Sequence, residues 1–297
     1  MLKMILVTGK NGQLGKSMKK IAGNYPQFDF TFVGREELDL ASNKSIADFF
    51  EGKHFDAIIN CAAYTAVDKA QSEPELADQV NHLAVKQLAE IAKHNNSTLI
   101  HISTDYVFDG TNHKPYTETD KTNPINVYGI TKLKGEQAIQ AINPKGLIIR
   151  TSWVYSEFGN NFVKTMLRIG EECDSLNVIY DQIGSPTYAT DLANAILAVL
   201  SSPPLIERDK GEGGNSIMQI YHYSNEGVCT WYDFAQAIFD IANTQCQVKP
   251  IETKNYPTPA RRPLYCLMNK SKIKKQITLT ATHWRISLKE LIMEILK

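Results

Sequence analysis

The stretch that decides the fold opens the chain: Met4-Ile5-Leu6-Val7-Thr8-Gly9-Lys10-Asn11-Gly12-Gln13-Leu14-Gly15. Its first four residues are apolar, which is typical of a strand buried on both faces of a parallel sheet. Three glycines follow in Gly-x-x-Gly-x-x-Gly spacing and lead into a helical pattern of apolar residues. This order predicts a dinucleotide-binding turn, because glycine lets the backbone approach a pyrophosphate and the helix start offers free N–H groups. A purely structural tight turn is the alternative.

Downstream of this turn, strand and helix patterns alternate as far as Arg150. We expect further strands at residues 28–33, 57–60, 98–103 and 146–150. We expect helices at residues 14–22, 45–50, 75–93 and 128–142. Such alternation predicts an α/β fold, a Rossmann-type doubly wound parallel sheet.

The regular alternation fades after Arg150, which indicates a smaller C-terminal α+β substrate domain. We assign residues 1–156 to a dinucleotide-binding domain to which residues 175–200 return, with a strand at 177–179 and a helix at 191–200 on the same sheet. Residues 157–174 and 201–297 form the predicted substrate-binding domain. Within it we expect a surface loop at 201–214, a helix at 231–242 capped by Thr230, an extended loop with four prolines at 250–263, and a final helix at 286–296.

Composition narrows the class of protein. The 297 residues carry no net charge, so the overall balance favours neither nucleic acid nor an anionic membrane as a partner. The five cysteines are widely spaced and form no Cys-x-x-Cys pair, which is typical of reduced thiols and of no zinc site. No segment has the apolar length of a membrane span or the pattern of a signal peptide. We therefore expect a cytoplasmic enzyme.

The end of the second strand bears on the cofactor. It reads Val33-Gly34-Arg35, and an arginine there can pair with the 2′-phosphate of NADPH, where a carboxylate would favour NAD. Glu36 and Glu37 lie close by, so NADH remains an alternative, and Arg35 as a plain surface charge is equally open. The predicted cofactor site comprises Gly9, Asn11, Gly12, Gln13, Leu14, Arg35, Asp39, Leu40, Ala62, Ala63, Tyr64, Tyr128 and Lys132.

A tyrosine and a lysine carry the predicted chemistry. Of the 13 tyrosines, only Tyr128 has a lysine four residues on, and positions i and i+4 share a helix face. A free phenol has a pKa near ~10. The ammonium of Lys132 is expected to lower that value, so that Tyr128 gives a proton to a carbonyl oxygen while hydride reaches the carbon. A solvated helix face is the alternative for this spacing.

A third member of the catalytic set is expected where the fourth strand ends, at Ser103-Thr104-Asp105. A hydroxyl there can bond the substrate oxygen or the Tyr128 phenol, and we choose Thr104. Ser103 is the competing choice, because strand alternation turns the two side chains in opposite directions. A strand-end cap is the structural alternative for both residues.

The motifs together resemble the extended short-chain dehydrogenase/reductase superfamily and, within it, the dTDP-4-dehydrorhamnose reductase family. The resemblance rests on the glycine turn, on Ser103–Gly110 and on Tyr128-Gly129-x-Thr131-Lys132. It is narrowed by the segments at 60–70, 150–155, 159–162, 181–187 and 256–263, so it runs nearly from end to end. A match that includes the C-terminal region is specific, since superfamily members usually diverge there.

The resemblance implies a reaction and its residues. The 4-keto group of dTDP-4-dehydro-6-deoxy-L-mannose is reduced by NADPH to dTDP-L-rhamnose, a donor for polysaccharide biosynthesis. Thr104, Tyr128 and Lys132 form the implied catalytic set. The implied substrate-binding residues are Thr104, Asp105, Trp153, Arg261 and Arg262. Core packing is the alternative for Trp153, and a loop-anchoring ion pair is the alternative for either arginine.

Three further expectations stay open. Some family members are Mg²⁺-bridged dimers, but Gly15, Lys16 and Thr190 offer no carboxylate cluster, so we predict no metal site, with a homodimer through other contacts left open. Another nucleotide-sugar 4-keto reductase, dehydratase or epimerase is a rival, although Tyr106 stands where related dehydratases have a glutamate. A non-catalytic regulatory subunit, like that of methionine adenosyltransferase, is the rival of a different class.

Overall fold

The computed structural model describes residues 2–201, 218–276 and 281–297. Its main element is a six-stranded sheet in the order β10-β5-β4-β3-β1-β2, in which all neighbouring strands run parallel. The strands are β1 Lys3–Thr8, β2 Phe28–Val33, β3 Ala57–Asn60, β4 Thr98–Thr104, β5 Gly146–Thr151 and β10 Gln219–His222. The strand order reverses between β1 and β3, which is where sheets of this kind bind ligands at their carboxyl edge. The predicted doubly wound α/β sheet is confirmed.

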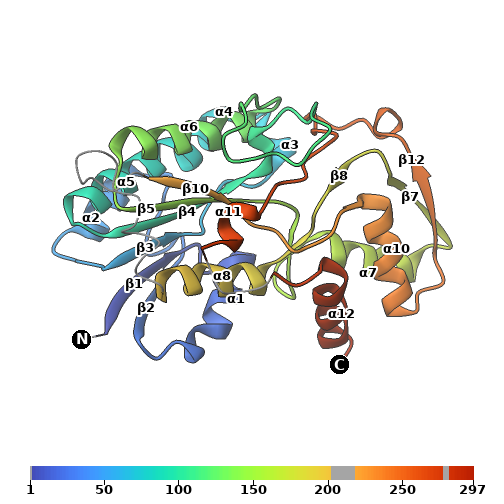
Figure 1. Cartoon of the computed structure of the whole chain (residues 1–297), viewed down its shortest axis with the longest axis horizontal. Helices are drawn as coiled ribbons and strands as arrows, with labels where there is room; N and C mark the ends of the chain where they lie inside the picture. Colours follow the sequence, from blue (N-terminus) through green and yellow to red (C-terminus); the bar gives the residue numbers. More distant parts are fainter. Residues whose placement is uncertain (1, 202–217, 277–280) are drawn as a thin grey trace.

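Helices cover both faces of this sheet (Figure 1). On one face lie α1 Gln13–Ile21 and α8 Ala189–Ser201, and on the other lie α2 Asn43–Phe50, α5 Ala84–His94 and α6 Val127–Ile142. The helix expected at 75–93 divides into α4 Pro74–Asp78, a π-helical turn η2 Gln79–Leu83, and α5. Short elements complete this part: η1 Ala22–Asn24, α3 Val67–Ala70, η3 Asp105–Val107 and α11 Ser271–Lys274.

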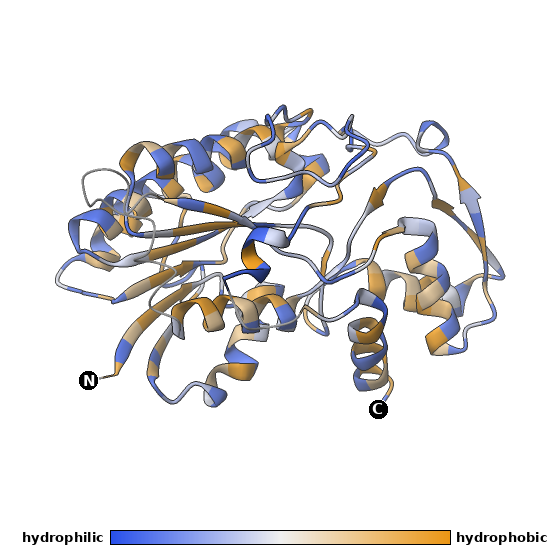
Figure 2. Ribbon diagram, viewed as in Figure 1, coloured by the Kyte–Doolittle hydropathy of each residue, from blue (hydrophilic) through white to orange (hydrophobic). Residues whose placement is uncertain are grey.

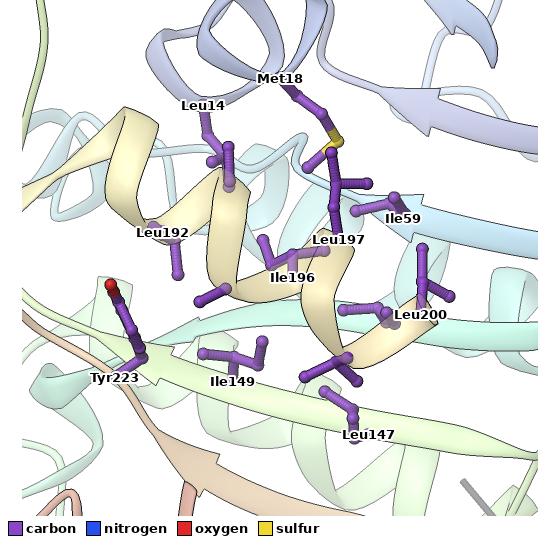
Figure 3. Packing of buried hydrophobic residues seen from close by; sticks show 14 of the residues in the cluster. Leu14, Met18, Ile59, Leu147, Ile149, Leu192, Ile196, Leu197, Leu200 and Tyr223 are labelled. Atoms are coloured by element: carbon purple, nitrogen blue, oxygen red, sulfur yellow. The ribbon is translucent and has the colours of Figure 1, made fainter. Parts of the chain in front are cut away.

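The core explains why the strand sequences read as continuous apolar runs. Successive β1 residues point to opposite faces, so Ile5 and Val7 pack under α1 and α8 while Leu6 packs under α2 and α5. Figure 3 shows the first of these layers, where Met18 of α1 and Leu197 of α8 meet Ile59 of β3. Figure 2 shows the same division, with apolar strands inside and helices that are polar on their outer sides.

A second, smaller part follows the sheet and has its own core. It contains α7 Phe162–Glu172, α10 Trp231–Ala242 and α12 Trp284–Ile295, which pack together through one apolar cluster. Its strands pair in twos: β7 Ser175–Ile179 with β12 Gln247–Ile251, β8 Ile183–Gly184 with β11 Cys229–Thr230, and β6 Val154–Tyr155 with β9 Thr187–Tyr188. A short turn, η4 Thr253–Asn255, follows β12. The expected helices at 231–242 and 286–296 are confirmed, and Thr230 caps the former in a capping box with Asp233.

Two expectations about strand placement are wrong. The strand expected at 177–179 on the main sheet lies in β7 and pairs with β12 in the smaller part. Conversely, β10 comes from the segment expected to be wholly substrate domain, yet it is the sixth strand of the main sheet, beside β5. The helix expected at 191–200 does pack on the main sheet as α8. Strand partners depend on long-range register, which a local apolar pattern does not encode.

The proline-rich segment at 250–263 begins inside a strand, because Pro250 belongs to β12. A proline is tolerated there since β12 pairs only with β7 and is an edge strand. Most of the loop expected at 201–214 lies outside the described residues. All five cysteines are free. Within the described ranges, no helix has both the length and the apolar character that crossing a membrane requires.

Candidate active site

One pocket of about 880 Å³ lies at the carboxyl edge of the sheet. Its walls come from the glycine turn after β1, the ends of β2, β3 and β4, the start of α6, and the loops around Trp153 and Asn160. All thirteen predicted cofactor residues line it, together with Thr104, Asp105 and Trp153. Arg261 and Arg262 are not among its lining residues. The fold thus brings nearly the whole predicted site to one place, while the role of each residue stays a prediction.

The glycine turn is built for close backbone approach. Gly9 has φ +72°, and a Cβ atom on it would lie 2.9 Å from the backbone nitrogen of Ala62. A Cβ on Gly15 would lie only 2.2 Å from the Gly9 carbonyl oxygen. Gly12 starts α1 without a side-chain cap, and the first turn of α1 has no acidic residue. The free N–H groups at this helix start therefore fit the pyrophosphate of a dinucleotide.

Gln13 is held by the protein itself. Its side-chain oxygen accepts hydrogen bonds from Ser156 Oγ and Asn161 Nδ2, both at 3.0 Å, and its amide nitrogen donates to the Val154 carbonyl. Gln13 thereby joins the glycine turn to the loop that closes the far side of the pocket. Asn161, which lines this wall, is also held locally by a hydrogen bond from its Nδ2 to the Ser156 carbonyl at 2.7 Å.

Charged side chains gather at the end of β2, where Arg35 and Asp39 line the pocket. The Arg35 guanidinium is largely exposed and lies 3.3 Å from an Asp39 carboxylate oxygen. Glu37 accepts a hydrogen bond from the Gly34 N–H at 2.8 Å and forms an ion pair with Lys10. The Lys10 ammonium and the Gly34 N–H hold the pKa of the Glu37 carboxyl below its usual range. The Glu37 carboxylate therefore already occupies two hydrogen-bond donors near Arg35.

Tyr128, Thr104 and Asp105 meet at the end of β4. Thr104 Oγ1 donates to Asp105 Oδ1 at 2.9 Å and accepts from the Tyr106 N–H. Burial raises the pKa of Tyr128 to about 12, while a hydrogen bond with Thr104 acts in the opposite direction. Burial also raises the pKa of the Asp105 carboxyl to about 6. The ring of Tyr106 packs edge-on against Tyr128, with the ring centroids 5.8 Å apart.

Lys132 departs from the sequence-based expectation. Its side-chain nitrogen Nζ is bound to the sheet, 2.6 Å from the Ile102 carbonyl oxygen and 3.2 Å from His101 Nε2. Burial lowers the pKa of Lys132 to about 8, and the nearby Glu136 carboxylate acts against this. The expected lowering of the Tyr128 pKa by Lys132 is therefore wrong for the protein alone. Burial of the phenol is the main cause of its raised pKa, and Lys132 Nζ contacts β4 instead.

The Ser103 hydroxyl is hydrogen-bonded to a side chain of α6. The hydroxyl donates to Glu136 at 2.5 Å, and Glu136 forms a buried, two-pronged ion pair with Arg150 of β5. A buried charge pair of this kind fixes α6 against the sheet, since either charge alone would be strongly destabilising. Ser103 thus serves the anchoring of α6, and the geometry favours Thr104 as the hydroxyl beside Tyr128.

Trp153 forms an aromatic wall with a partner that the sequence did not indicate. Its ring stacks on Trp231 with centroids 3.7 Å apart and planes 13° apart. Among the described residues, four other than glycine have positive φ; three are asparagines and the fourth is Trp153, at +48°. Such a bulky residue is strained in this conformation. Both tryptophans line the pocket and also pack on the smaller part's core, so Trp153 has the packing role considered as the alternative, and its contact with substrate stays a prediction.

The two arginines of the C-terminal loop behave differently from the implied phosphate contacts. Arg262 forms an ion pair with Asp68 of α3 at 2.7 Å, and the same aspartate accepts from the Ala260 N–H. This is the loop-anchoring role considered as the alternative. The Arg261 side chain is exposed, and its carbonyl oxygen accepts from Asn126, which also caps α6. The C-terminal loop is thereby fastened to the helix that carries Tyr128.

The sequence predicts no metal site. In residues 2–201, 218–276 and 281–297, no group of three or more His, Cys, Asp or Glu side chains is placed to hold a metal ion.

A parallel sheet of this order, a glycine turn cradling its carboxyl edge and a Tyr-x-x-x-Lys pair in one pocket define a Rossmann-type NADP-dependent oxidoreductase. The model of the RmlD substrate binding domain family matches residues 3–297. A dTDP-4-dehydrorhamnose reductase of Sinorhizobium fredii is 40% identical and covers 98% of this chain, which in turn covers 97% of it. This chain belongs to the RmlD family of dTDP-4-dehydrorhamnose reductases.

Solved structures of family members agree with the fold. The dTDP-4-dehydrorhamnose reductase of Clostridium acetobutylicum superposes with a TM-score of 0.90 at 38% identity, covering 99% of this chain and 100% of its own. The Bacillus anthracis enzyme, solved in complex with NADP, also gives a TM-score of 0.90, at 35% identity with the same coverage.

Proposed function

We propose that this chain reduces the 4-keto group of dTDP-4-dehydro-6-deoxy-L-mannose with NADPH and so forms dTDP-L-rhamnose. The observation that carries the proposal is the meeting of Tyr128, Thr104 and Lys132 with the glycine turn in a single pocket. Full-length similarity to curated dTDP-4-dehydrorhamnose reductases supports the substrate. When bound, NADPH supplies the hydride, and the chain's own residues orient the sugar and deliver the proton.

Each residue has a proposed task. Tyr128 donates its phenolic proton to the developing alkoxide, which suits a phenol that burial keeps protonated. Thr104 bonds the same oxygen and supports the phenolate that remains. Asp105 accepts from a sugar hydroxyl, and Trp153 with Trp231 offers an apolar face to the deoxy carbon. The lining residues Gly9, Gly12 and Leu14 hold the pyrophosphate from the start of α1.

The rival chemistries lack support in the pocket. Elimination needs an acid or base after Thr104-Asp105, and Tyr106 there is a buried phenol packed on Tyr128, with a pKa raised by burial. A binding-only subunit has no need of a buried lysine one helical turn from a buried tyrosine. The assignment to reduction is therefore the better account of this pocket.

The direct test is an assay with purified protein. We expect dTDP-4-dehydro-6-deoxy-L-mannose to cause loss of the NADPH absorbance band, with one NADPH consumed per sugar and a product two hydrogens heavier by mass spectrometry. Controls omit the sugar or use the corresponding sugar without the nucleotide. If the wild-type protein binds NADPH but consumes none with this substrate, the proposal is wrong.

Cofactor preference yields a second prediction. Glu37 competes for Lys10 and the Gly34 N–H at the place where a 2′-phosphate approaches Arg35. Glu37→Gln removes that competing charge, so we expect kcat/KM for NADPH to rise several-fold while the value for NADH stays nearly constant. The matched control is Glu36→Gln, the same change at the neighbouring exposed position. Equal shifts in the two variants, or an equal rise with NADH, would contradict this role of Glu37.

A further inference from the structure

A row of buried polar side chains crosses the sheet behind the Tyr128–Lys132 pair. Thr8, Asn60 and His101 are register partners on β1, β3 and β4, so their side chains point to the same face of the sheet. Thr8 Oγ1 lies 2.7 Å from Asn60 Oδ1, and Asn60 Nδ2 lies 3.1 Å from His101 Nδ1. His101 Nε2 then lies 3.2 Å from Lys132 Nζ, and the His101 side chain has no exposed surface.

The hydrogen bonds of this row can be assigned donors and acceptors in order, starting from a backbone N–H, which can only donate. The Ala62 N–H donates to Thr8 Oγ1 at 3.2 Å. The Thr8 hydroxyl then donates to Asn60 Oδ1, and Asn60 Nδ2 is left to donate to His101 Nδ1. A neutral imidazole carries one N–H and one lone pair, so the proton of His101 lies on Nε2 and faces Lys132. Neither His101 nor the Asn60 side chain is among the site residues predicted from the sequence.

This direction has a consequence for the lysine. An N–H donor makes a hydrogen bond to a neutral amine but not to an ammonium, which has no lone pair. Reversing the ring tautomer would suit an ammonium, but Nδ1–H would then face the Asn60 amide hydrogens. Turning that amide would leave the Thr8 hydroxyl without an acceptor, and a buried unsatisfied group costs about 1–3 kcal/mol.

We propose that His101 is a positioning residue that presents a fixed Nε2–H donor to Lys132 and keeps this buried amine partly neutral until an anionic cofactor binds. Thr8, Ala62 and Lys132 line the pocket assigned to the cofactor, so the row begins and ends at the wall of that pocket. Binding of NADPH then protonates, from solvent, the fraction of Lys132 Nζ that is neutral in the free protein. The inference rests on the cofactor part of the proposed function and not on the identity of the sugar.

Other ionisable groups face Lys132 and have opposing effects. Glu136, one helical turn along α6, favours the ammonium, but its charge is shared with Arg150, which contacts His222 of β10. Tyr128 precedes Lys132 by one turn, and Asp105 follows β4. Burial lowers the pKa of Lys132 to about 8 and lowers that of His101 well below its usual value, so the ring stays neutral. The stability that the neutral amine contributes is fully present above the ordinary lysine pKa of 10.5 and is lost as the pH falls from there through about 8.

The experiment measures proton uptake on NADPH binding by titration calorimetry at pH 8 in buffers of different ionisation enthalpy. We expect the wild type to take up a measurable fraction of a proton at this pH, because burial lowers the pKa of Lys132 to about 8. Asn60→Asp offers His101 an acceptor, which moves the ring proton to Nδ1 and presents a lone pair to a charged Lys132. Uptake should fall close to zero in this variant. Wild-type binding without uptake overturns the proposal.

Two further measurements keep the test decisive. Nitrogen-15 NMR of histidine-labelled, cofactor-free protein should show His101 as the Nε2–H tautomer in the wild type and as the Nδ1–H tautomer in Asn60→Asp. The matched control is Asn126→Asp, the same change at a buried cap of α6 without contact to His101, which should keep the uptake. If Asn60→Asp does not fold, Thr8→Val is the second variant, because without the Thr8 hydroxyl the Asn60 amide can turn and accept a hydrogen bond from His101. An Nδ1–H tautomer in the wild type, or equal loss of uptake in the control, overturns the proposal.

Discussion

Tyr128→Phe lowers kcat for carbonyl reduction by about 10²- to 10⁴-fold, the range that a positioned general acid contributes. The phenylalanine ring keeps the packing against Tyr106 and leaves the Lys132 contacts to β4 in place. NADPH affinity should therefore change by less than a few-fold. The two quantities are separated by single-turnover rates at saturating NADPH and by fluorescence titration of the cofactor.

The matched control for this variant is Tyr106→Phe. It removes a neighbouring buried phenol from the same pocket, with its ring centroid 5.8 Å from that of Tyr128. Because no proton transfer is assigned to Tyr106, kcat of the Tyr106→Phe enzyme should stay within a few-fold of the wild-type value. A Tyr128→Phe enzyme with wild-type kcat, or equal losses in both variants, would show that the proton comes from another group.

Gly15→Ala is the second change with a large expected effect, and it acts on the glycine turn. The new Cβ would lie 2.2 Å from the Gly9 carbonyl oxygen and 2.8 Å from the Gly9 carbonyl carbon. These are backbone atoms of a turn that itself packs closely on Ala62, so relief requires moving the start of α1. We expect unfolding free energy to fall by about 1–3 kcal/mol, the usual range for an overpacked site.

The same shift should weaken NADPH binding by about a hundredfold, since roughly two hydrogen bonds to charged phosphate oxygens at about 1.5 kcal/mol each would be misaligned. Gly23→Ala is the matched control, because nothing lies within 4 Å of a Cβ there and its backbone is unstrained. Denaturant unfolding of both variants measures the change in unfolding free energy, and cofactor titration measures the change in NADPH affinity. Normal NADPH affinity in a folded Gly15→Ala protein would mean that this turn does not hold the pyrophosphate.

What the sequence determined by itself was local. The run from Met4 to Gly15 was enough to place a buried strand, a tight turn and a helix, because each depends on periodicity and backbone freedom within a few residues. The pairing of Tyr128 with Lys132 was equally accessible, since four residues make slightly more than one helical turn. All thirteen residues predicted for the cofactor site line one pocket.

The tertiary structure decided everything that depends on partners distant in the chain. It placed β10 in the main sheet, turned Arg262 to Asp68 and stacked Trp231 on Trp153. It also aligned Thr8, Asn60 and His101, which are 52 and 41 residues apart, into one hydrogen-bonded row. The physical reason is that strand register and side-chain burial are fixed only when segments distant in the sequence pack together. Burial and the neighbouring groups in turn decide which side chains carry a proton.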